Sequence, residues 1–344
     1  MRYARKMVVY FAISGIIVTF APNYLTQSGG NNHNPVAYRN MDRRIIGIGE
    51  TVLDIIFRND QPLKAVPGGS TFNALISIGR TGTPCVMATE VGDDHVADIV
   101  TDFLKANNVD TSYVFRHKGT QSHVSLAFLN EQNDAQYQFY KNHAALTMDN
   151  DMPEVHEGDI VLFGSYFAIS PMLRTYVATF LKRAKAAGAI LYYDINFRAS
   201  HLADLPATMP HILENMQLAS VVRGSAEDFQ ILFGCNDAAE VYKKHISPHC
   251  PVFIYTDGAH PIRLFTPTLC ESFPAQPIET VSTIGAGDNF NAGFCYALYR
   301  SGITDPTALN VQQFAPLIAM GQRFSSAVCA TLDNYIPEKL ITEA

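Results

Sequence analysis

From Met41 onward, runs of β-branched and aromatic residues alternate with segments whose apolar residues recur at helical spacing. Strand-like runs occur at 160–163, 189–193, 219–222 and 252–255. Residues 171–187 have the spacing of a helix that ends at Gly188, and another helical pattern follows Ser225. Alternating strands and helices predict an α/β fold, in which a mostly parallel sheet is covered by helices on both faces.

One segment departs from this alternation. Residues 123–129 and 135–140 alternate between polar and apolar at period two around the polar stretch 131–134, which predicts an antiparallel hairpin. A hairpin that interrupts an α/β chain is suited to close over a substrate site. The sequence therefore predicts a small β lid near 120–143.

The first 40 residues carry a different pattern. Basic residues precede the apolar run 7–21, and residues 19–21 suit a signal peptidase, so this stretch has the layout of a secretory signal. The apolar run is too short to span a membrane comfortably. In the alternative interpretation Met41 is the natural start, residues 1–40 are an upstream extension, and one domain covers 41–344.

The composition favours small molecules as partners. The chain has 344 residues, 47% of them hydrophobic, which suits an ordinary globular protein. Its formal net charge of −7 argues against nucleic acid as the main partner, because such binding relies on surplus Lys and Arg. The six cysteines include no Cys-x-x-Cys pair, which favours reduced, buried thiols over a disulfide framework or a zinc site.

Residues 281–294 carry the candidate chemistry. Gly285, Ala286 and Gly287 run into Asp288, and an apolar helix pattern follows. Small residues at a helix N-terminus leave its amides open to an anion such as phosphate. The adjacent carboxylate is placed to accept a proton from a hydroxyl that attacks this phosphate, which indicates phosphoryl transfer to an alcohol. Taken alone, the segment also suits an ordinary helix start, because Asp is a favoured N-cap.

A second glycine-rich turn supports the first interpretation. Gly68 and Gly69 lead into a helical pattern that carries Asn73. Together with Thr283 and residues 285–288, they resemble the two signatures of the PfkB or ribokinase-like carbohydrate kinases. Further similarity runs through 49–57, 91–100, 162–167, 194–198 and 255–258, so the resemblance covers nearly all of the chain from 41 to 336.

The resemblance implies a ribokinase-like three-layer α/β sandwich, with a central mostly parallel sheet and a small β lid over the sugar. It also implies ATP-dependent phosphorylation of a sugar hydroxyl, with magnesium neutralising the nucleotide phosphates. In that chemistry Asp288 is the general base, and the amides of Gly285, Ala286 and Gly287 form an anion hole. The implied partners are a sugar and ATP, and the need for ATP favours the cytoplasm.

The resemblance assigns five residues to the sugar side, namely Asp54, Gly68, Gly69, Asn73 and Arg198. Asp54 would accept hydrogen bonds from sugar hydroxyls, although an Asp at a strand end is also an ordinary feature. The two glycines would let backbone reach the sugar, and Asn73 offers both a donor and an acceptor. Arg198 would lie near the substrate or phosphate, or else cap a helix or pair with Asp194.

The resemblance assigns Arg223, Ser225, Thr256 and Gly258 to the nucleotide side. Glu227 matches a family glutamate that helps to hold magnesium and its waters. The family's asparagine position is Gly224 here, and Ser225 or Arg223 could replace its function, with Arg223 meeting phosphate directly. Ser282 stands where the family usually has an acidic residue, so dependence on a monovalent cation is left open.

Within the family, residues 125–146, 162–167 and 192–198 look most like the fructokinase branch. In that branch lid residues, here Phe139, Tyr140 and Lys141, approach the sugar, although they could simply pack the lid. Ribokinase, 2-keto-3-deoxygluconate kinase and adenosine kinase-like activities stay open, as does a non-catalytic sugar- or nucleotide-binding protein. By analogy with the family, the lid could also join two subunits in a homodimer.

Overall fold

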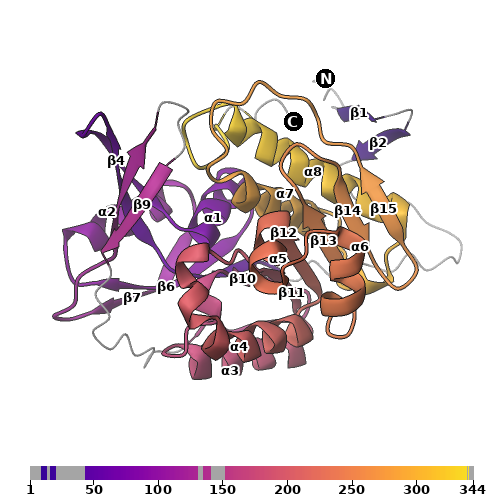
Figure 1. Ribbon diagram of the computed structural model, residues 1–344, viewed down its shortest axis with the longest axis horizontal. Helices are drawn as coiled ribbons and strands as arrows, with labels where there is room; N and C mark the ends of the chain where they lie inside the picture. The colour runs from indigo at the N-terminus through magenta and orange to yellow at the C-terminus, as the bar shows by residue number, and fades with distance from the viewer. Residues whose placement is uncertain are drawn as a thin grey trace, which may run out of the picture.

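A sheet of nine strands forms the centre of the molecule (Figure 1), and the computed structural model describes residues 9–13, 16–20, 43–130, 135–140, 152–338 and 340. In sheet order the strands are β15 (Cys270–Phe273), β14 (Ile262–Phe265), β13 (Phe253–Thr256), β12 (Val221–Ser225), β11 (Ile190–Asp194), β10 (Ile160–Gly164), β3 (Ile45–Ile48), β6 (Cys85–Gly92) and β7 (Asp110–His117). The strands from β13 to β7 run parallel, whereas β14 and β15 form an antiparallel edge. The predicted mostly parallel sheet is therefore confirmed.

Helices cover both faces of this sheet, which confirms the three-layer sandwich. One face carries α1 (Ser70–Arg80), α2 (His95–Ala106), α7 (Ala286–Arg300) and α8 (Val311–Cys329). The other face carries α3 (Arg174–Ala186), α4 (Leu205–Leu218), α5 (Ala226–Phe233) and α6 (Ala238–Val241). The remaining helical turns are η1 (Tyr166–Ala168), η2 (Ala199–Asp204), η3 (Tyr242–Ile246) and η4 (Pro306–Ala308).

The buried side chains divide into two cores, one on each side of the sheet. Neighbouring residues of β3 point to opposite cores. Ile45 belongs to the core under α7, and Ile46 belongs to the core under α3. This division explains why the central strands read as continuous apolar runs rather than as alternating ones. The predicted helix 171–187 appears as α3, and the chain turns at Gly188 with a φ of 82°.

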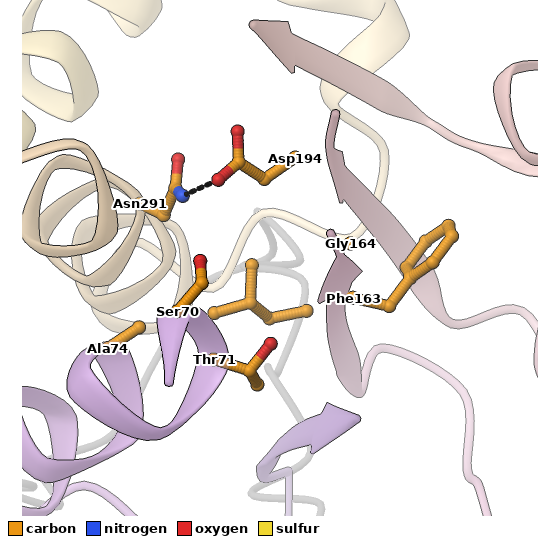
Figure 2. A pocket seen from close by; sticks show the side chains of 8 residues that line it. Ser70, Thr71, Ala74, Phe163, Gly164, Asp194 and Asn291 are labelled. Atoms are coloured by element: carbon orange, nitrogen blue, oxygen red, sulfur yellow. Dashed lines mark hydrogen bonds between the residues drawn. The ribbon is translucent and has the colours of Figure 1, made fainter. Parts of the chain in front are cut away.

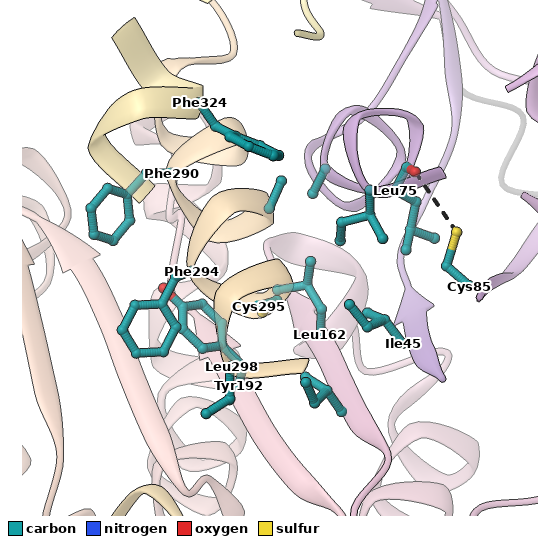
Figure 3. Packing of buried hydrophobic residues seen from close by; sticks show 14 of the residues in the cluster. Ile45, Leu75, Cys85, Leu162, Tyr192, Phe290, Phe294, Cys295, Leu298 and Phe324 are labelled. Carbon is teal, nitrogen blue, oxygen red and sulfur yellow. Dashed lines mark hydrogen bonds between the residues drawn. The ribbon is translucent and has the colours of Figure 1, made fainter. Parts of the chain in front are cut away.

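Helix α7 is tightly packed on two sides. An added Cβ at Gly293 would lie 2.3 Å from the carbonyl oxygen of Met320 on α8, so only glycine fits there. Phe294 packs against Tyr192 of β11, with ring centroids 5.4 Å apart (Figure 3). This packing holds the N-terminus of α7 beside the carboxyl end of β11.

The lid is a separate sheet of four strands, in the order β5 (Gln61–Gly68), β4 (Val52–Arg58), β8 (Val124–Leu129) and β9 (Ala135–Tyr140). The antiparallel pairing of β8 with β9 confirms the predicted hairpin, whose polar turn 131–134 lies outside the described residues. The lid is larger than predicted, because the chain leaves the core after β3 and builds β4 and β5 before α1. Strand β4 pairs with β8 in parallel.

The segment before the core contains a small antiparallel pair, β1 (Val9–Ile13) and β2 (Ile16–Phe20). Most of residues 1–40 lie outside the described residues, so both interpretations of this stretch stay predictions. Within the described ranges, no helix is both long and apolar enough to cross a membrane. All six cysteines are free thiols, and all but Cys235 and Cys270 are buried.

Candidate functional site

Helix α7 begins inside the small-residue segment, so Asp288 lies in its first turn. Gly285 is the N-cap, with a left-handed φ of 76° that favours glycine. The first amides of a helix have no acceptor within it, and here the Ala286 amide donates instead to the Thr283 carbonyl at 3.2 Å. The amides of Gly285 and Gly287 are therefore the better candidates for holding an anion.

Both carboxylate oxygens of Asp288 accept hydrogen bonds from the first turn of α1. Ser70 Oγ donates to Oδ1 at 2.7 Å, and Asn73 Nδ2 donates to Oδ2 at 2.8 Å. Burial raises the pKa of Asp288, and nearby Asp194 adds to this, while the two hydrogen bonds and Arg198 counteract it. A carboxylate with a raised pKa is a better general base than an ordinary one.

Asn73 lies beside Asp288, and its contact with a sugar stays a prediction. Its amide nitrogen is committed to Asp288, and its Oδ1 is buried with no hydrogen-bond partner among the described residues. The turn before it is also constrained, because Gly69 has a φ of 124° and an added Cβ would lie 2.4 Å from the Glu50 carbonyl oxygen. Ser70 and Asn73 therefore fix the orientation of the Asp288 carboxylate.

Asp54 is a buried carboxylate on lid strand β4. Ser125 of β8 donates a hydrogen bond to its Oδ1. Burial raises the pKa of Asp54 to about 6, and the bond from Ser125 partly counteracts this. A Cβ at Gly68 would lie 2.8 Å from Asp54 Oδ2, so glycine is required to keep this face of the carboxylate open.

A buried polar network links the ends of β11 and β12 to α7. Asp194 accepts from Asn291 Nδ2 at 2.8 Å (Figure 2). It also accepts from Arg223 Nη1 at 3.0 Å. Asn291 Oδ1 in turn accepts from the hydroxyl of Tyr192 at 3.0 Å. Sequence reasoning missed the role of Asp194 and Asn291, although an Asn three residues after Asp288 lies on the same face of the helix and was a usable signal.

Arg223 lies directly behind the N-terminus of α7. Its Nη2 donates to Thr256 Oγ1 at 2.6 Å, and an added Cβ on Gly287 would lie 3.0 Å from its Nη1. These contacts fix the guanidinium beside the small residues at the start of α7, where its charge adds to the positive end of the helix and attracts an anion. A direct contact of Arg223 with phosphate stays a prediction. The alternative pairing of Arg198 with Asp194 is wrong, because Asp194 pairs with Arg223 while Arg198 is exposed.

Residues 43–333 match the pfkB family carbohydrate kinases. The chain belongs to this family. A fructokinase of Rhizobium leguminosarum bv. trifolii is 30% identical over 264 residues, which cover 74% of this chain and 79% of the relative.

Solved structures show the same fold. A fructokinase from Vibrio cholerae O395, with fructose, ADP and calcium ion bound, has a TM-score of 0.76 at 19% identity and covers 86% of this chain and 95% of its own. An aminoimidazole riboside kinase from Salmonella enterica, with aminoimidazole riboside and an ATP analogue, has a TM-score of 0.74 at 21% identity. The match covers 87% of this chain and 99% of that chain. The chain is thus a phosphotransferase of the sugar kinase type, and the fold is common to kinases that act on different substrates.

The departure of this carbohydrate kinase at Gly224 has a packing reason. A Cβ at this position would lie 2.5 Å from the ring of Phe229, so asparagine does not fit. Ser225 instead forms a capping box with Asp228 at the start of α5. Glu227 is exposed, whereas Asp228 is buried. The pKa of Asp228 is raised overall, because burial and Asp194 outweigh the lowering by Ser225 and Arg223. Asp228 therefore lies near the charges of Asp194 and Arg223, and the role of the exposed Glu227 in holding magnesium stays a prediction.

Two further predicted positions of the kinase have local roles. The Ser282 amide donates to the Cys329 carbonyl at 3.2 Å, and Ser282 Oγ accepts from the Ile284 amide at 3.2 Å, so this serine fastens the loop before α7. Gly258 has a left-handed φ of 52° in the exposed turn between β13 and β14. Neither position adds charge to the site.

The register of the lid separates its aromatic residues. Ser125 pairs with Asp54 on one side and with Phe139 on the other, so these three side chains share one face. Tyr140 is paired with Val124 and therefore points to the opposite face. Lys141 lies outside the described residues. The lid thus carries Phe139, and not Tyr140, on the same face as the Asp54 carboxylate.

Proposed function

We propose that this kinase transfers the terminal phosphoryl group of ATP to fructose, with Asp288 as the general base. The environment of Asp288 carries the proposal, because a carboxylate of raised pKa is oriented by two hydrogen bonds beside the N-terminus of α7. The choice of fructose is supported by the 30% identical fructokinase of Rhizobium.

The arrangement suits an in-line transfer. A sugar hydroxyl beside Asp288 gives its proton to the carboxylate as it attacks the phosphoryl group. The charge that develops on this group meets the amides of Gly285 and Gly287, with Arg223 fixed behind them. Asp54 accepts hydrogen bonds from other hydroxyls of the sugar, so the lid and the core each hold part of it.

A magnesium ion at this site would have few ligands from the protein itself. Across the residues that the structure describes, no group of three or more His, Cys, Asp or Glu could hold a metal ion. Mg²⁺ commonly keeps several waters and binds through one or two carboxylates together with substrate phosphates. Glu227, the residue predicted to hold magnesium, is exposed at the start of α5 and would be such a carboxylate, and the ion would neutralise phosphate charge. Asp194 and Asp228 fit this role less well, because both oxygens of each already accept hydrogen bonds.

We also propose a cytoplasmic homodimer that pairs through the lid. The need for ATP supports the location. Strand β9 is an outer strand of the lid sheet, and lid residues Leu63, Phe139 and Tyr140 are 55%, 48% and 52% exposed. Sedimentation of the full chain tests the dimer, and a monomer at micromolar concentration would contradict it.

A coupled ADP-release assay tests the proposed function. The full chain is assayed with ATP and Mg²⁺ against fructose, ribose, 2-keto-3-deoxygluconate, adenosine and a blank without sugar, in potassium and in choline salts. We expect fast turnover with fructose alone. Turnover with another sugar would retain the mechanism and reject fructose, and silence with every substrate would favour a non-catalytic binding protein.

A further inference from the structure

The segment after α8 joins three parts of the site. Tyr335 donates from its hydroxyl to the Pro67 carbonyl of lid strand β5 at 2.6 Å. The Ile336 amide donates to Ser77 Oγ of α1 at 3.1 Å. Asn334 contacts α7, because its carbonyl accepts from Asn289 Nδ2 at 2.8 Å. This segment therefore contacts the lid, the helix that orients the base, and the helix that carries it.

The backbone of Asn334 has a fixed position. Asn289, the residue after the catalytic base, donates through Nδ2 both to the Asn334 carbonyl and to the Gly285 carbonyl, each at 2.8 Å. A Cβ added to Gly285 would lie 3.0 Å from the Asn334 oxygen. These contacts hold the carbonyl end of Asn334, so its side chain extends from a fixed backbone.

The side chain of Asn334 points towards the sugar side. A Cβ on Gly68 would lie 2.8 Å from Asp54 Oδ2 and 3.9 Å from Asn334 Nδ2, so both side chains lie on the same side of Gly68. One amide donor and one carboxylate acceptor thus face the space beside this glycine. Asn334 is 9% exposed and Asp54 is 8% exposed, so both groups meet a ligand out of bulk water.

We propose that Asn334 is a specificity-determining residue of the sugar site, whose amide donates to the same hydroxyl that donates to Asp54. A hydroxyl is the group that matches this pair, because it accepts one hydrogen bond and donates another. A sugar without that hydroxyl leaves both buried groups without a partner, and such sites discriminate strongly. This inference rests on the proposed sugar kinase function and extends its site to the C-terminal segment.

The test compares N334A and N334D with the wild type and with D333N. The control removes the charge of the exposed neighbour Asp333, which pairs with Lys64 at 3.2 Å. N334A keeps the backbone carbonyl bond to Asn289, and N334D keeps the shape of the side chain while placing a second carboxylate beside Asp54. For each protein, kcat and the KM values for sugar and for ATP are measured, together with the melting temperature.

We expect N334A to raise the sugar KM about tenfold, because a buried hydrogen bond to the substrate is lost. N334D raises it further through like-charge repulsion, while kcat and the ATP KM stay within about twofold and D333N behaves as wild type. Monodeoxy sugars identify the hydroxyl. With the sugar that lacks the contacted hydroxyl, N334A and the wild type should have the same KM, because neither protein can make that hydrogen bond.

An unchanged sugar KM in both variants, or a parallel rise in the ATP KM, would overturn the inference and reduce Asn334 to a structural contact of α7. If N334A does not fold, N334D decides the question. If the wild type phosphorylates no sugar, the proposed function is rejected independently of the role of Asn334. Calorimetry of sugar binding to the wild type and N334A then decides the role of Asn334, and equal affinity or no binding rejects it.

Discussion

The two halves of the site are built differently. The half proposed to perform the chemistry lies on core helices, where Ser70 and Asn73 of α1 hold Asp288 of α7. The half proposed to hold the sugar is assembled from the lid and the C-terminal segment, which bring Asp54, Ser125 and Asn334 together. Because the two halves lie on different elements, we expect substitutions in one to leave the other largely intact.

The largest expected effect comes from breaking the chemical half alone. Asp288→Asn keeps the shape of the side chain but removes the base, so we expect kcat to fall by about 10³-fold, within the range of general-base catalysis. Sugar binding, measured by calorimetry, stays within about threefold because Asp54 is untouched. Loss of binding in parallel with turnover would show that the two halves are not separable.

A smaller loss follows from crowding the N-terminus of α7. Gly287→Ala adds a Cβ 3.0 Å from Arg223 Nη1 and pushes the guanidinium or the helix amides out of place. We expect kcat to fall about 100-fold, at the lower end of the range for loss of one stabilising donor in an anion hole. Gly234→Ala is the control for a general loss of stability, because its added Cβ meets nothing within 4 Å although its φ of 65° strains the backbone there. Equal activity of both variants would contradict this role of Gly287.

The sugar half has its own pH dependence. Because burial raises the pKa of Asp54 to about 6, the group takes up a proton as the pH falls through that value and stops accepting from the sugar. The sugar KM therefore rises below about pH 6. Ser125→Ala removes the bond that lowers this pKa, so the rise begins at higher pH. A sugar KM that is flat between pH 5 and 8 would count against this role of Asp54.

The smallest expected effect is on stability, and it distinguishes Asp228 from Glu227 on the nucleotide side. Asp228 accepts from the Ser225 amide at 2.6 Å and from the Phe197 amide at 2.7 Å. Asp228→Ala should lower the free energy of unfolding by about 1–2 kcal/mol, as loss of a helix cap does, whereas Glu227→Ala should change it by less than about 0.5 kcal/mol. Urea denaturation measures both, and a reversed order would show that the exposed glutamate has the structural role.

The chemical half could be predicted from the sequence because its signals are local. Small residues and a carboxylate within one helical turn indicate an anion site and a base, whatever surrounds them. Likewise, apolar runs of strand length identified β10 to β13, and period-two alternation identified the hairpin of β8 and β9. The boundary of α7 moved by a few residues, because the left-handed conformation of Gly285 starts the helix before Asp288.

By itself, then, the sequence determined the α/β class, the position of the candidate base at the start of a helix and the two glycine-rich turns, since each depends on neighbours along the chain. Only the tertiary structure decided that β4 and β5 complete the lid, that Arg223 rather than Arg198 pairs with Asp194, and that Asp228 lies buried near that pair. It also placed the side chain of Asn334 near Gly68, although the two residues are far apart in the chain. Such contacts depend on how whole elements pack, and no local pattern of residue types records which distant side chain fills a given space.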